Sequence, residues 1–511
     1  MRNMKIAAAV SGVLAACAAP SAFASYVGEP AAQTTAAAAP AANFFWLAGS
    51  SAAVAGFGTS VGADLCNTTA APISTFQTIP GKVPAAQNAG TPVPAVGTPD
   101  FRMFSCTASA ALGALAGSTI NVAYRADGGS VVGAYAPLRN VAVNELDITT
   151  AWCVADASTA NTYDCATALN TTVAVPTGAL AITGTTTVNG PKDTYGGAVV
   201  PHTIFWGISD LEPGAFGNPA VAPKTPWAGG GNNDPLAAGL GAPYPYTFLG
   251  ADASPATLQA MPHTLLFQQT FGFVASTNLN ITDISSADVA AILSGTVTDW
   301  SKVARTAADP GFPGKVTVAA TPIVVCQRDL GSGTRTSADV IFTGDGCNTT
   351  GAALKNVDAN PALDNFSTPD ELACVNAGSG NAIGYVSVDN FSKVAPAGAT
   401  YPNVHSLTLD GRTDSNAASA VGGIQYAVEA SINKNVAYVP NANENIFFPR
   451  LITDLQQIAT APQSAQINTL PHHGTNASNS GTVQVNGKIN MTSFVRDTTT
   501  LGNSCSSLNL Q

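Results

Sequence analysis

Short apolar segments recur along this chain, and most are followed by a turn of Gly, Ser or Thr and then by a helix-like stretch. Strands that alternate with helices usually form a largely parallel sheet covered by helices. The pattern therefore predicts an α/β fold. Because 511 residues are too many for one ordinary core, we expect two lobes. The clearest predicted strands are 119–124, 203–207, 317–325 and 382–388, and the clearest predicted helices are 51–65, 286–293, 336–342 and 417–432.

The first 24 residues have the three parts of a secretory signal peptide. Arg2 and Lys5 give a positive start, residues 6–19 are apolar, and residues 22–24 (Ala-Phe-Ala) form a small-residue cleavage site. We therefore expect a periplasmic or secreted protein. The alternative is a lipoprotein, because Leu-Ala-Ala-Cys ending at Cys17 has the form of a lipoprotein box.

The cysteines indicate disulfide bonds. Nine are present, and eight remain once Cys17 is assigned to the leader or to a lipid anchor. An even number in an exported chain is typical of a disulfide set. Proximity in sequence pairs Cys66 with Cys106 and Cys153 with Cys165. The partners of four others stay open: Cys326, Cys347, Cys374 and Cys505. No C-x-x-C pair indicates a zinc or thioredoxin-type site.

The charge of the chain excludes several classes of partner. Lys plus Arg number 20 and Asp plus Glu 31, which gives a net charge of −11. So few cations cannot build the basic surface that nucleic acid or anionic lipid requires. Charge-driven disorder is also excluded, because 46% of the residues are hydrophobic and only 10% are charged.

Four segments end a predicted strand in small or polar residues: 44–53, 124–130, 205–210 and 324–334. Small residues let the backbone approach a ligand, and free N–H groups at a helix start attract anions. Arg328 lies four residues before Ser332 and can bind an oxyanion through two parallel hydrogen bonds. For any single segment, helix capping or a simple turn is the more common role.

Taken together and in order, these segments resemble the periplasmic phosphate-binding proteins of bacterial phosphate uptake and their extracellular relatives. Residues 49–53 (Gly-Ser-Ser-Ala-Ala) stand where that family has Gly-Ala-Gly-Ala-Thr. Ser130 falls at its ligand serine, and residues 207–210 (Gly-Ile-Ser-Asp) are similar to its Gly-x-Ser-Asp strand end. Arg328 with residues 331–334 (Gly-Ser-Gly-Thr) is the most specific similarity.

The resemblance implies a two-lobed periplasmic-binding-protein fold of type II, with family-specific loop and β insertions. The expected divisions are a signal peptide 1–24, a low-complexity linker 25–42, lobe one over 43–265 and 401–511, and lobe two over 266–400. Lobe one would carry an insertion at about 140–200, with a β-hairpin at 171–190, and a long loop at 221–247.

The resemblance also implies that inorganic phosphate binds between the lobes. The implied ligand-binding residues are Ser51, Ala53, Val54, Ser130, Asp210, Arg328, Ser332, Gly333 and Thr334. Because Ala53 replaces the family threonine, only backbone N–H groups can serve at Ala53 and Val54. A carboxylate such as Asp210 repels an anion unless it accepts a hydrogen bond from a protonated one. Phosphate carries such a proton at neutral pH and sulfate does not, so Asp210 is expected to select phosphate.

Two other functions stay open at this point. One is hydrolysis of phosphate esters, as in some extracellular relatives, although neither G-x-S-x-G nor H-E-x-x-H occurs and only His472 and His473 are adjacent. The other is a secreted structural protein that keeps the fold without the ligand. We expect a binding protein rather than an enzyme, with no catalytic residue, cofactor or metal. The expected partners are inorganic phosphate and an ABC transporter permease, the chain itself being a monomer.

Overall fold

The structure is a computed structural model of the whole chain. It describes residues 30–50, 53, 58, 61–78, 101–126, 129–140, 142–149, 151–156, 159–166, 199–216, 255–328, 332–343, 362–365, 368–377, 380–396, 400–412, 426–456, 470–471, 483–484, 488–489, 494–496 and 508–510. Within these ranges no helix has the length and apolar character needed to cross a membrane.

One continuous sheet holds most strands, in the order β13-β12-β14-β10-β18-β9-β1-β4-β3-β2-β7-β6. Its strands are β1 Phe44–Gly49, β2 Ser74–Thr78, β3 Phe101–Thr107, β4 Thr119–Arg125, β6 Trp152–Ala155, β7 Thr162–Ala166, β9 Trp206–Ser209, β10 His263–Ser276, β12 Val324–Arg328, β13 Ala362–Asn365, β14 Ala382–Ser387 and β18 Ala427–Lys434, with β15 Val394–Ala395, β16 Tyr401–Ser406 and β19 Leu470–Pro471 attached at its side. Smaller pairs are β5 Ala142–Leu146 with β8 Val199–Thr203, β11 Asp283–Ile284 with β17 Thr408–Leu409, β20 Val483–Gln484 with β21 Lys488–Ile489, and β22 Phe494–Arg496 with β23 Leu508–Leu510.

Helices flank the sheet. The α-helices are α2 Ala31–Ala37, α4 Ser130–Arg139, α5 Pro255–Gln259, α6 Ser286–Leu293, α7 Gly333–Ala338, α8 Thr368–Ala377 and α10 Glu444–Leu455. Short 3-10 and π turns are η1 Ala41–Asn43, η2 Val61–Leu65, η3 Ala110–Leu115, η4 Pro213–Phe216, η6 Thr277–Leu279, η7 Trp300–Lys302, η8 Asp339–Thr343 and η9 Val388–Lys393.

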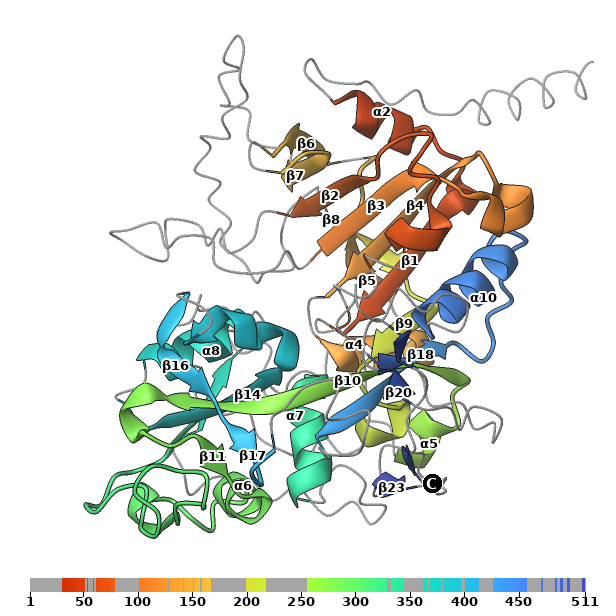
Figure 1. The fold of residues 1–511 in the computed structure, drawn as a ribbon. Coiled ribbons are helices and arrows are strands. Elements are labelled where there is room, and N and C mark those ends of the chain that lie inside the picture. The colour runs from red at the N-terminus through yellow and green to blue at the C-terminus, as the bar shows by residue number, and fades with distance from the viewer. Residues whose placement is uncertain are drawn as a thin grey trace, which may run out of the picture.

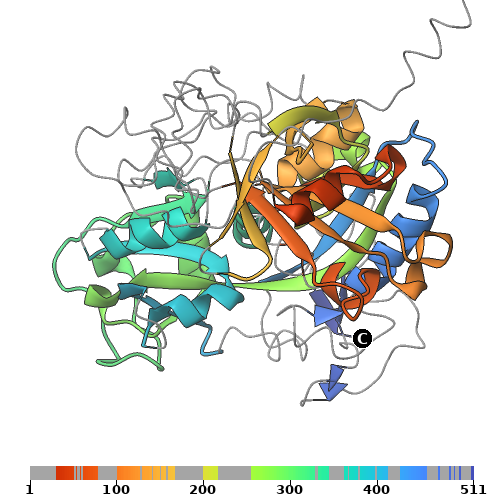
Figure 2. The ribbon, with the colours of Figure 1, turned by 90° about the horizontal axis from the view of Figure 1, so that it is seen from above.

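Two lobes share this sheet, and β10 and β18 join them. Figure 1 shows β10 running out of the lobe that holds β1 and β4 into the lobe that holds α6 and α8, and Figure 2 shows the same strand between the lobes from above. β10 pairs with β18 in one lobe and with β14 in the other. Phe271 and Phe273 of β10 pack against the ring of Tyr426, just before β18. The connection between the lobes is therefore two antiparallel strands with an aromatic contact.

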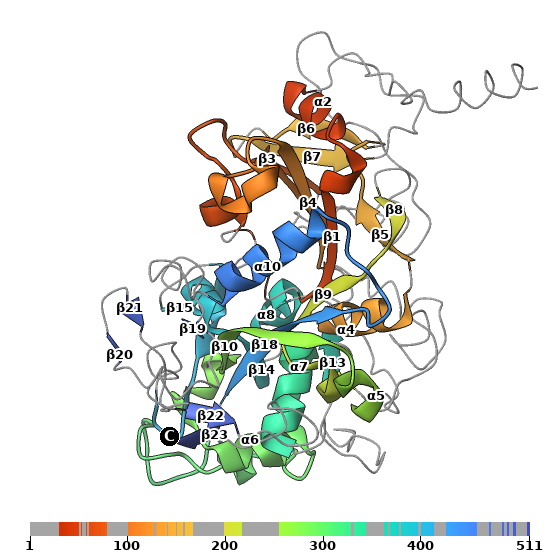
Figure 3. The ribbon, with the colours of Figure 1, turned by 90° about the vertical axis from the view of Figure 1, so that its right-hand side faces the viewer.

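Lobe one is a sheet covered on both faces. α4 packs against β1 and β9, and α10 lies on the opposite side of these strands (Figure 3). Glycine lets α4 come close: a Cβ on Gly133 would lie 2.1 Å from the carbonyl oxygen of Ile208, and one on Gly207 would lie 2.2 Å from the carbonyl oxygen of Gly133. This close approach brings the first turn of α4 to the carboxyl ends of β1 and β9.

Residues 31–37, expected inside a linker, form α2 of lobe one. The Gln33 amide donates to the carbonyl oxygens of Ile148 (3.0 Å) and Ala151 (2.7 Å), and Ala36 is fully buried. A sequence rich in Ala and Thr looks like a linker because it has few large apolar side chains. Here the small side chains allow a helix to lie flat on the lobe.

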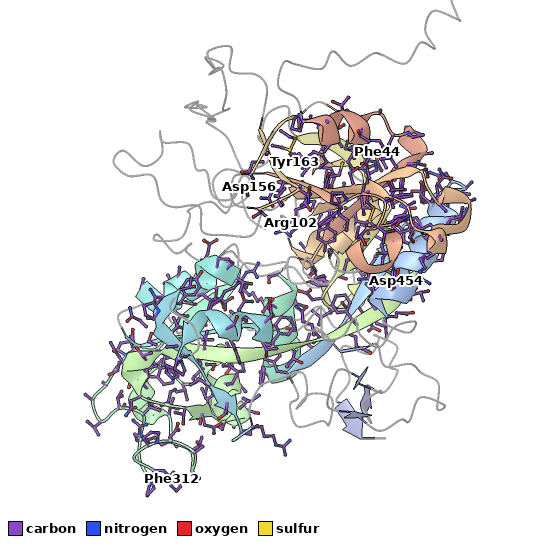
Figure 4. The ribbon with its side chains drawn as sticks, turned by 45° about the horizontal axis from the view of Figure 1, so that its top comes forward. Phe44, Arg102, Asp156, Tyr163, Phe312 and Asp454 are labelled. Carbon is purple, nitrogen blue, oxygen red and sulfur yellow. A yellow bond between two sulfur atoms is a disulfide. The ribbon has the colours of Figure 1, made fainter. Side chains whose placement is uncertain are left out.

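Lobe two contains the strands β12, β13 and β14, the outer half of β10, and helices α6, α7 and α8. β16 pairs with β10, and β17 pairs with β11, which lies between β10 and α6 in sequence. β16 and β17 therefore pair with strands of lobe two, although both follow the boundary expected at 400. Phe312, 54% exposed, lies at the far end of this lobe, and Asp454 lies in lobe one on α10 (Figure 4).

The structure confirms several predicted elements and corrects others. The strands predicted at 119–124 and 382–388 and the helix at 286–293 correspond to β4, β14 and α6. The helix predicted at 417–432 is wrong over its described part, because Ala427–Lys434 is the strand β18. β18 is hydrogen-bonded on both sides, and its apolar residues (Val428, Ala430, Ile432) alternate with polar residues (Glu429, Ser431, Asn433) that are also buried.

Other boundaries shift. Within the strand predicted at 317–325 only residues 324 and 325 are in a strand, β12, and residues 204 and 205 separate β8 from β9. The helix predicted at 336–342 begins earlier, as α7, and continues as the π turn η8. Of the helix predicted at 51–65, the described part contains η2. The hairpin at 171–190 and the loop at 221–247 lie outside the described residues.

Three disulfides are present among the described residues. Cys66–Cys106 and Cys153–Cys165 confirm the pairs expected from proximity. Cys326–Cys374 joins two of the four cysteines whose partners were open and ties β12 to α8. The remaining cysteines, 17, 347 and 505, lie outside the described residues.

Candidate functional site

The first half of the site forms where three neighbouring strands end. β1 lies between β4 and β9 and is parallel to both, so their carboxyl ends share one edge of the sheet. Ser50 directly follows β1, Asp210 directly follows β9, and Ser130 begins the helix after β4. All three side chains are at most 2% exposed. The strand order therefore gathers two hydroxyls and one carboxyl at the lobe interface.

The Asp210 carboxyl is held by these two serines. The Ser50 hydroxyl donates to Asp210 Oδ1, and the Ser130 hydroxyl also hydrogen-bonds the carboxylate. The Asp210 N–H donates to Ser130 Oγ at 3.1 Å. Burial raises the pKa of Asp210, and the serine hydrogen bonds and the charge of Arg328 only partly oppose that rise. Asp210 is thus a fixed, buried acceptor that holds a proton more readily than an exposed aspartate.

Lobe two touches this carboxyl through Gly333, the first residue of α7. A Cβ on Gly333 would lie 2.3 Å from Asp210 Oδ2 and 2.4 Å from Ser130 Oγ. The neighbouring Ser332 and Thr334 are 3% and 2% exposed. Glycine is therefore required at 333 for the lobes to meet as they do.

Arg328 ends β12 and is 2% exposed. Its Nη1 donates to Thr368 Oγ1 at 3.0 Å, and Arg335 Nη1 donates to its backbone oxygen at 3.1 Å. Its charge lowers the pKa of two carboxyls against the effect of burial, Asp210 in lobe one and Glu371 in lobe two. Arg328 is thus a cation at the lobe interface, and its charge acts on one carboxyl of each lobe.

Two tyrosines fix the backbone around the site. The Tyr124 hydroxyl donates to the Ser50 carbonyl oxygen at 2.6 Å, and the Tyr426 hydroxyl donates to the Thr334 carbonyl oxygen at 3.1 Å. Both side chains are at most 1% exposed. Tyr426 directly precedes β18, so the first turn of α7 is tied to the strand that joins the lobes.

The structure places most of the residues expected from sequence at this interface. Ser130, Asp210 and Gly333 are in contact, Arg328 acts on Asp210 through its charge, and Ser332 and Thr334 flank Gly333. Ser51 and Val54 lie outside the described residues. The N–H of Ala53 donates to Ser50 Oγ at 2.9 Å, so this expected donor is used within its own turn.

Three residues at the site escaped the sequence analysis: Ser50, Thr368 and Glu371. Ser50 is adjacent to Ser51 in the same turn, and a shift of one residue would have found it. Thr368 bonds Arg328, and the charge of Arg328 acts on Glu371, because α8 packs against β12 and β13. No local pattern in the sequence indicates that arrangement.

Among the described residues no group of three or more His, Cys, Asp and Glu side chains could hold a metal ion. The described histidines lie elsewhere: His202 contacts Asp147 at 3.3 Å, His263 contacts the Met261 carbonyl oxygen, and His405 contacts the Ile281 carbonyl oxygen. His472 and His473 are outside the described residues.

Comparisons with known proteins found one family match and several similar solved structures. Residues 257–438 match the PBP superfamily domain. No curated protein matches the chain. Among solved structures, an ABC-type phosphate transport receptor from Vibrio cholerae is 17% identical, with 42% of this chain and 73% of that chain covered and a TM-score of 0.31. A phosphate-binding protein from Stenotrophomonas maltophilia is 11% identical, with 53% and 77% covered and a TM-score of 0.31.

The domain match and the strand order point to the same fold. Two α/β lobes joined by β10 and β18 form the two-lobed, type II fold of periplasmic binding proteins. In this fold the carboxyl ends of the strands from both lobes face the space between the lobes, where ligands bind. The contact between Asp210 and Gly333 lies at that place.

Proposed function

We propose that this chain is an exported solute-binding protein that captures inorganic phosphate between its two lobes. The observation that carries the proposal is Asp210, a buried carboxyl held by Ser50 and Ser130 and facing lobe two at Gly333. A carboxyl in an anion site accepts a hydrogen bond only from a protonated anion, and phosphate is protonated at neutral pH.

The donors proposed for phosphate come from both lobes. Arg328 supplies the one cation and can bind two oxygens at once. The hydroxyls of Ser130, Ser332 and Thr334 and the N–H of Gly333 add neutral donors, and Ser51 and Val54 complete the set in lobe one. Recognition by neutral donors and a single arginine suits a chain whose net charge is −11, because it needs no positive surface.

Binding between lobes would couple capture to closure. The two lobes are linked by β10 and β18, and a ligand that bridges them stabilises the closed arrangement. The bond from Tyr426 to the Thr334 carbonyl oxygen links the α7 turn to β18, so a shift of one lobe moves ligand-binding groups of the other.

Selectivity follows from the same carboxyl. Sulfate offers Asp210 no proton, so the two like charges meet without a hydrogen bond, and the site rejects sulfate. We propose binding rather than ester hydrolysis, since the described histidines bond elsewhere and the described site pairs no serine with a histidine.

Export is proposed from residues 1–24, with cleavage after Ala24 and release to the periplasm or the medium. Phosphate would then be handed to an ABC transporter permease or retained as a scavenged store. The lobe boundaries proposed for the mature chain are those expected from sequence, except that residues 31–37 move to lobe one and residues 401–412 to lobe two.

Calorimetric titration of the mature chain tests the proposal. The protein is first unfolded, dialysed free of phosphate and refolded with its disulfides intact, and phosphate and sulfate are then titrated separately at pH 7.5. We expect a saturable heat with phosphate and none with sulfate at the same concentration. No heat with phosphate, or equal affinity for both anions, would reject phosphate capture.

A further inference from the structure

One face of α8 is fixed along β12. Thr368, Glu371 and Cys374 are spaced three residues apart and therefore lie on the same side of the helix. Thr368 accepts a hydrogen bond from Arg328, and Cys374 is bonded to Cys326, two residues before Arg328 on β12. Glu371 lies between these two attachments. The helix is thus held against the strand on both sides of Glu371.

The Glu371 carboxyl is fully buried in this position. Its Oε1 accepts the N–H of Tyr385 at 2.8 Å, whereas Oε2 has no hydrogen-bond partner among the described residues. A Cβ on Gly384 would lie 3.2 Å from Oε1, so β14 leaves little space beside the carboxyl. A buried oxygen without a partner is costly when it carries charge.

Few charged groups face this carboxyl. α8 packs against β10, β12, β13, β14 and β16. Arg328 of β12 and Tyr385 of β14 are the ionisable residues that act on Glu371. Among the remaining groups, the charge of Asp370 acts on Tyr401 and His405 bonds to the Ile281 carbonyl oxygen. The side chain of Asp364 on β13 lies outside the described residues, and β10 has only His263 at its far end.

Burial raises the pKa of Glu371 to about 8, although the charge of Arg328 and the Tyr385 N–H act in the opposite direction. The Glu371 carboxyl therefore gains or loses its charge near pH 8, where the guanidinium of Arg328 remains positively charged. When Glu371 is neutral, the charge of Arg328 is available to Asp210 and to an anion. When it is ionised, it competes for that charge.

We propose that Glu371 is a positioning residue that acts on Arg328 through its charge and couples oxyanion binding to its own proton. The proposal rests on phosphate capture at the Asp210–Arg328 interface. An anion at Arg328 disfavours ionised Glu371, so above pH 8 a proton passes from solvent to the carboxylate as the anion binds and returns to solvent as it leaves. Glu371 touches no ligand in this scheme and acts through Arg328 alone.

The sign of the pH effect follows from linkage. Below pH 8 the carboxyl is protonated in the free protein and in the complex, so it adds no pH dependence. Above pH 8 the free protein loses the proton while the complex retains it, and phosphate affinity falls by up to about tenfold per pH unit. In Glu371→Gln no proton exchanges, so this fall disappears.

The test is calorimetric titration of the mature chain with inorganic phosphate between pH 6.5 and 9.5. It compares the wild type, Glu371→Gln, and the control Asp370→Asn, which removes the neighbouring carboxyl on α8. The ratio of wild-type Kd to Glu371→Gln Kd cancels the titration of phosphate and of Asp210. We expect the ratio to be constant below pH 7.5 and to rise about tenfold by pH 9 to 9.5, while Asp370→Asn follows the wild type.

Each outcome decides between the two proposals. A constant ratio across the whole range with phosphate still binding overturns the role of Glu371 alone. No phosphate heat at any pH overturns phosphate capture and the coupling with it. If Glu371→Gln does not fold, wild-type titrations at pH 9 in two buffers of different ionisation enthalpy decide: uptake of close to one proton per phosphate supports the coupling, and no uptake overturns it.

Discussion

Gly333 in lobe two packs directly against the Asp210 carboxyl of lobe one, so closely that a Cβ on the glycine would lie 2.3 Å from Asp210 Oδ2. The same atom would lie 2.4 Å from Ser130 Oγ. The closed arrangement of the lobes therefore depends on a missing side chain at one position. The groups proposed to bind phosphate meet only in that arrangement.

Replacing this glycine should separate binding from stability. In Gly333→Ala we expect phosphate affinity to fall by about tenfold or more, equivalent to about 1.4 kcal/mol, because the methyl group pushes α7 away from Asp210. The thermal midpoint should stay the same or rise, since alanine favours a helix more than glycine does. Calorimetry and thermal unfolding measure the two effects.

The control is Gly62→Ala, whose Cβ would meet only the end of the Ile73 side chain at 3.2 Å. Unchanged affinity in Gly333→Ala would show that the contact is not part of the binding arrangement.

Asp210→Asn should weaken the distinction between phosphate and sulfate. The amide removes the negative charge and can donate to an unprotonated anion, so the affinity ratio should fall by about two orders of magnitude. Competition titrations with both anions measure the ratio. Asp454→Asn, the same change on α10 in the core of lobe one, serves as the control. The proposed origin of selectivity is wrong if Asp210→Asn keeps the wild-type ratio.

Arg328→Ala should weaken the binding of every oxyanion by the same factor, because the arginine attracts an anion whether or not that anion carries a proton. We expect a loss of about 2–5 kcal/mol in binding, the usual range for one partner of a buried charge pair. Phosphate and arsenate titrations should show the same factor. Arg305→Ala is the matched control, since Arg305 bonds only to backbone oxygens on the outer part of lobe two. Retained binding in Arg328→Ala would exclude Arg328 as the cation of the site.

The sequence was sufficient to predict the α/β class and most of the interface residues. Asp210, Ser130 and Gly333 each follow a strand end closely, so a local strand, turn and helix order was enough to suggest them. Ser50 was missed in favour of Ser51 because the choice between adjacent serines depends on the orientation of the turn. Gly49 sets that orientation, because its φ is 139° and a Cβ there would lie 1.7 Å from the Ile208 carbonyl oxygen.

Long-range features were beyond local patterns. β18 was predicted as a helix although its apolar and polar residues alternate; its partners β9 and β10, which fix it as a strand, lie more than 150 residues earlier in the chain. The pairing of Cys326 with Cys374 required knowing that α8 lies on β12. Glu371 depends on the same packing, and its sequence context of Thr, Pro and Asp is that of an ordinary helix start.

The Cys326–Cys374 disulfide should affect both stability and binding. Removing it in Cys326→Ala/Cys374→Ala frees a loop of 48 residues, for which chain entropy predicts a loss of about 4 kcal/mol. Phosphate affinity should also fall, because α8 holds Arg328 through Thr368.

Cys66→Ala/Cys106→Ala is the control: its separation of 40 residues predicts a similar loss of stability, without a change in affinity. Urea unfolding and calorimetry measure the two quantities. Equal effects of both double variants on affinity would argue against a specific role for α8.

The buried Asp454 carboxyl in the core of lobe one should make the stability of the protein depend on pH. Asp454 on α10 has a fully buried side chain, 3.1 Å from Arg450, and burial together with the nearby Asp64 raises its pKa to about 7. Between the ordinary aspartate value of 3.8 and about 7, the folded chain binds a proton that the unfolded chain has released. Stability contributed by this group is therefore lost as the pH rises through that window.

Asp454→Asn keeps the shape and cannot ionise, so its free energy of unfolding should equal that of the wild type near pH 4 and exceed it at pH 8. The gain is at most about 4 kcal/mol, at 1.36 kcal/mol for each unit between the two pKa values. Urea unfolding of both proteins at the two pH values measures it, and a wild-type to variant difference that is the same at both would show that Asp454 stays ionised in the fold.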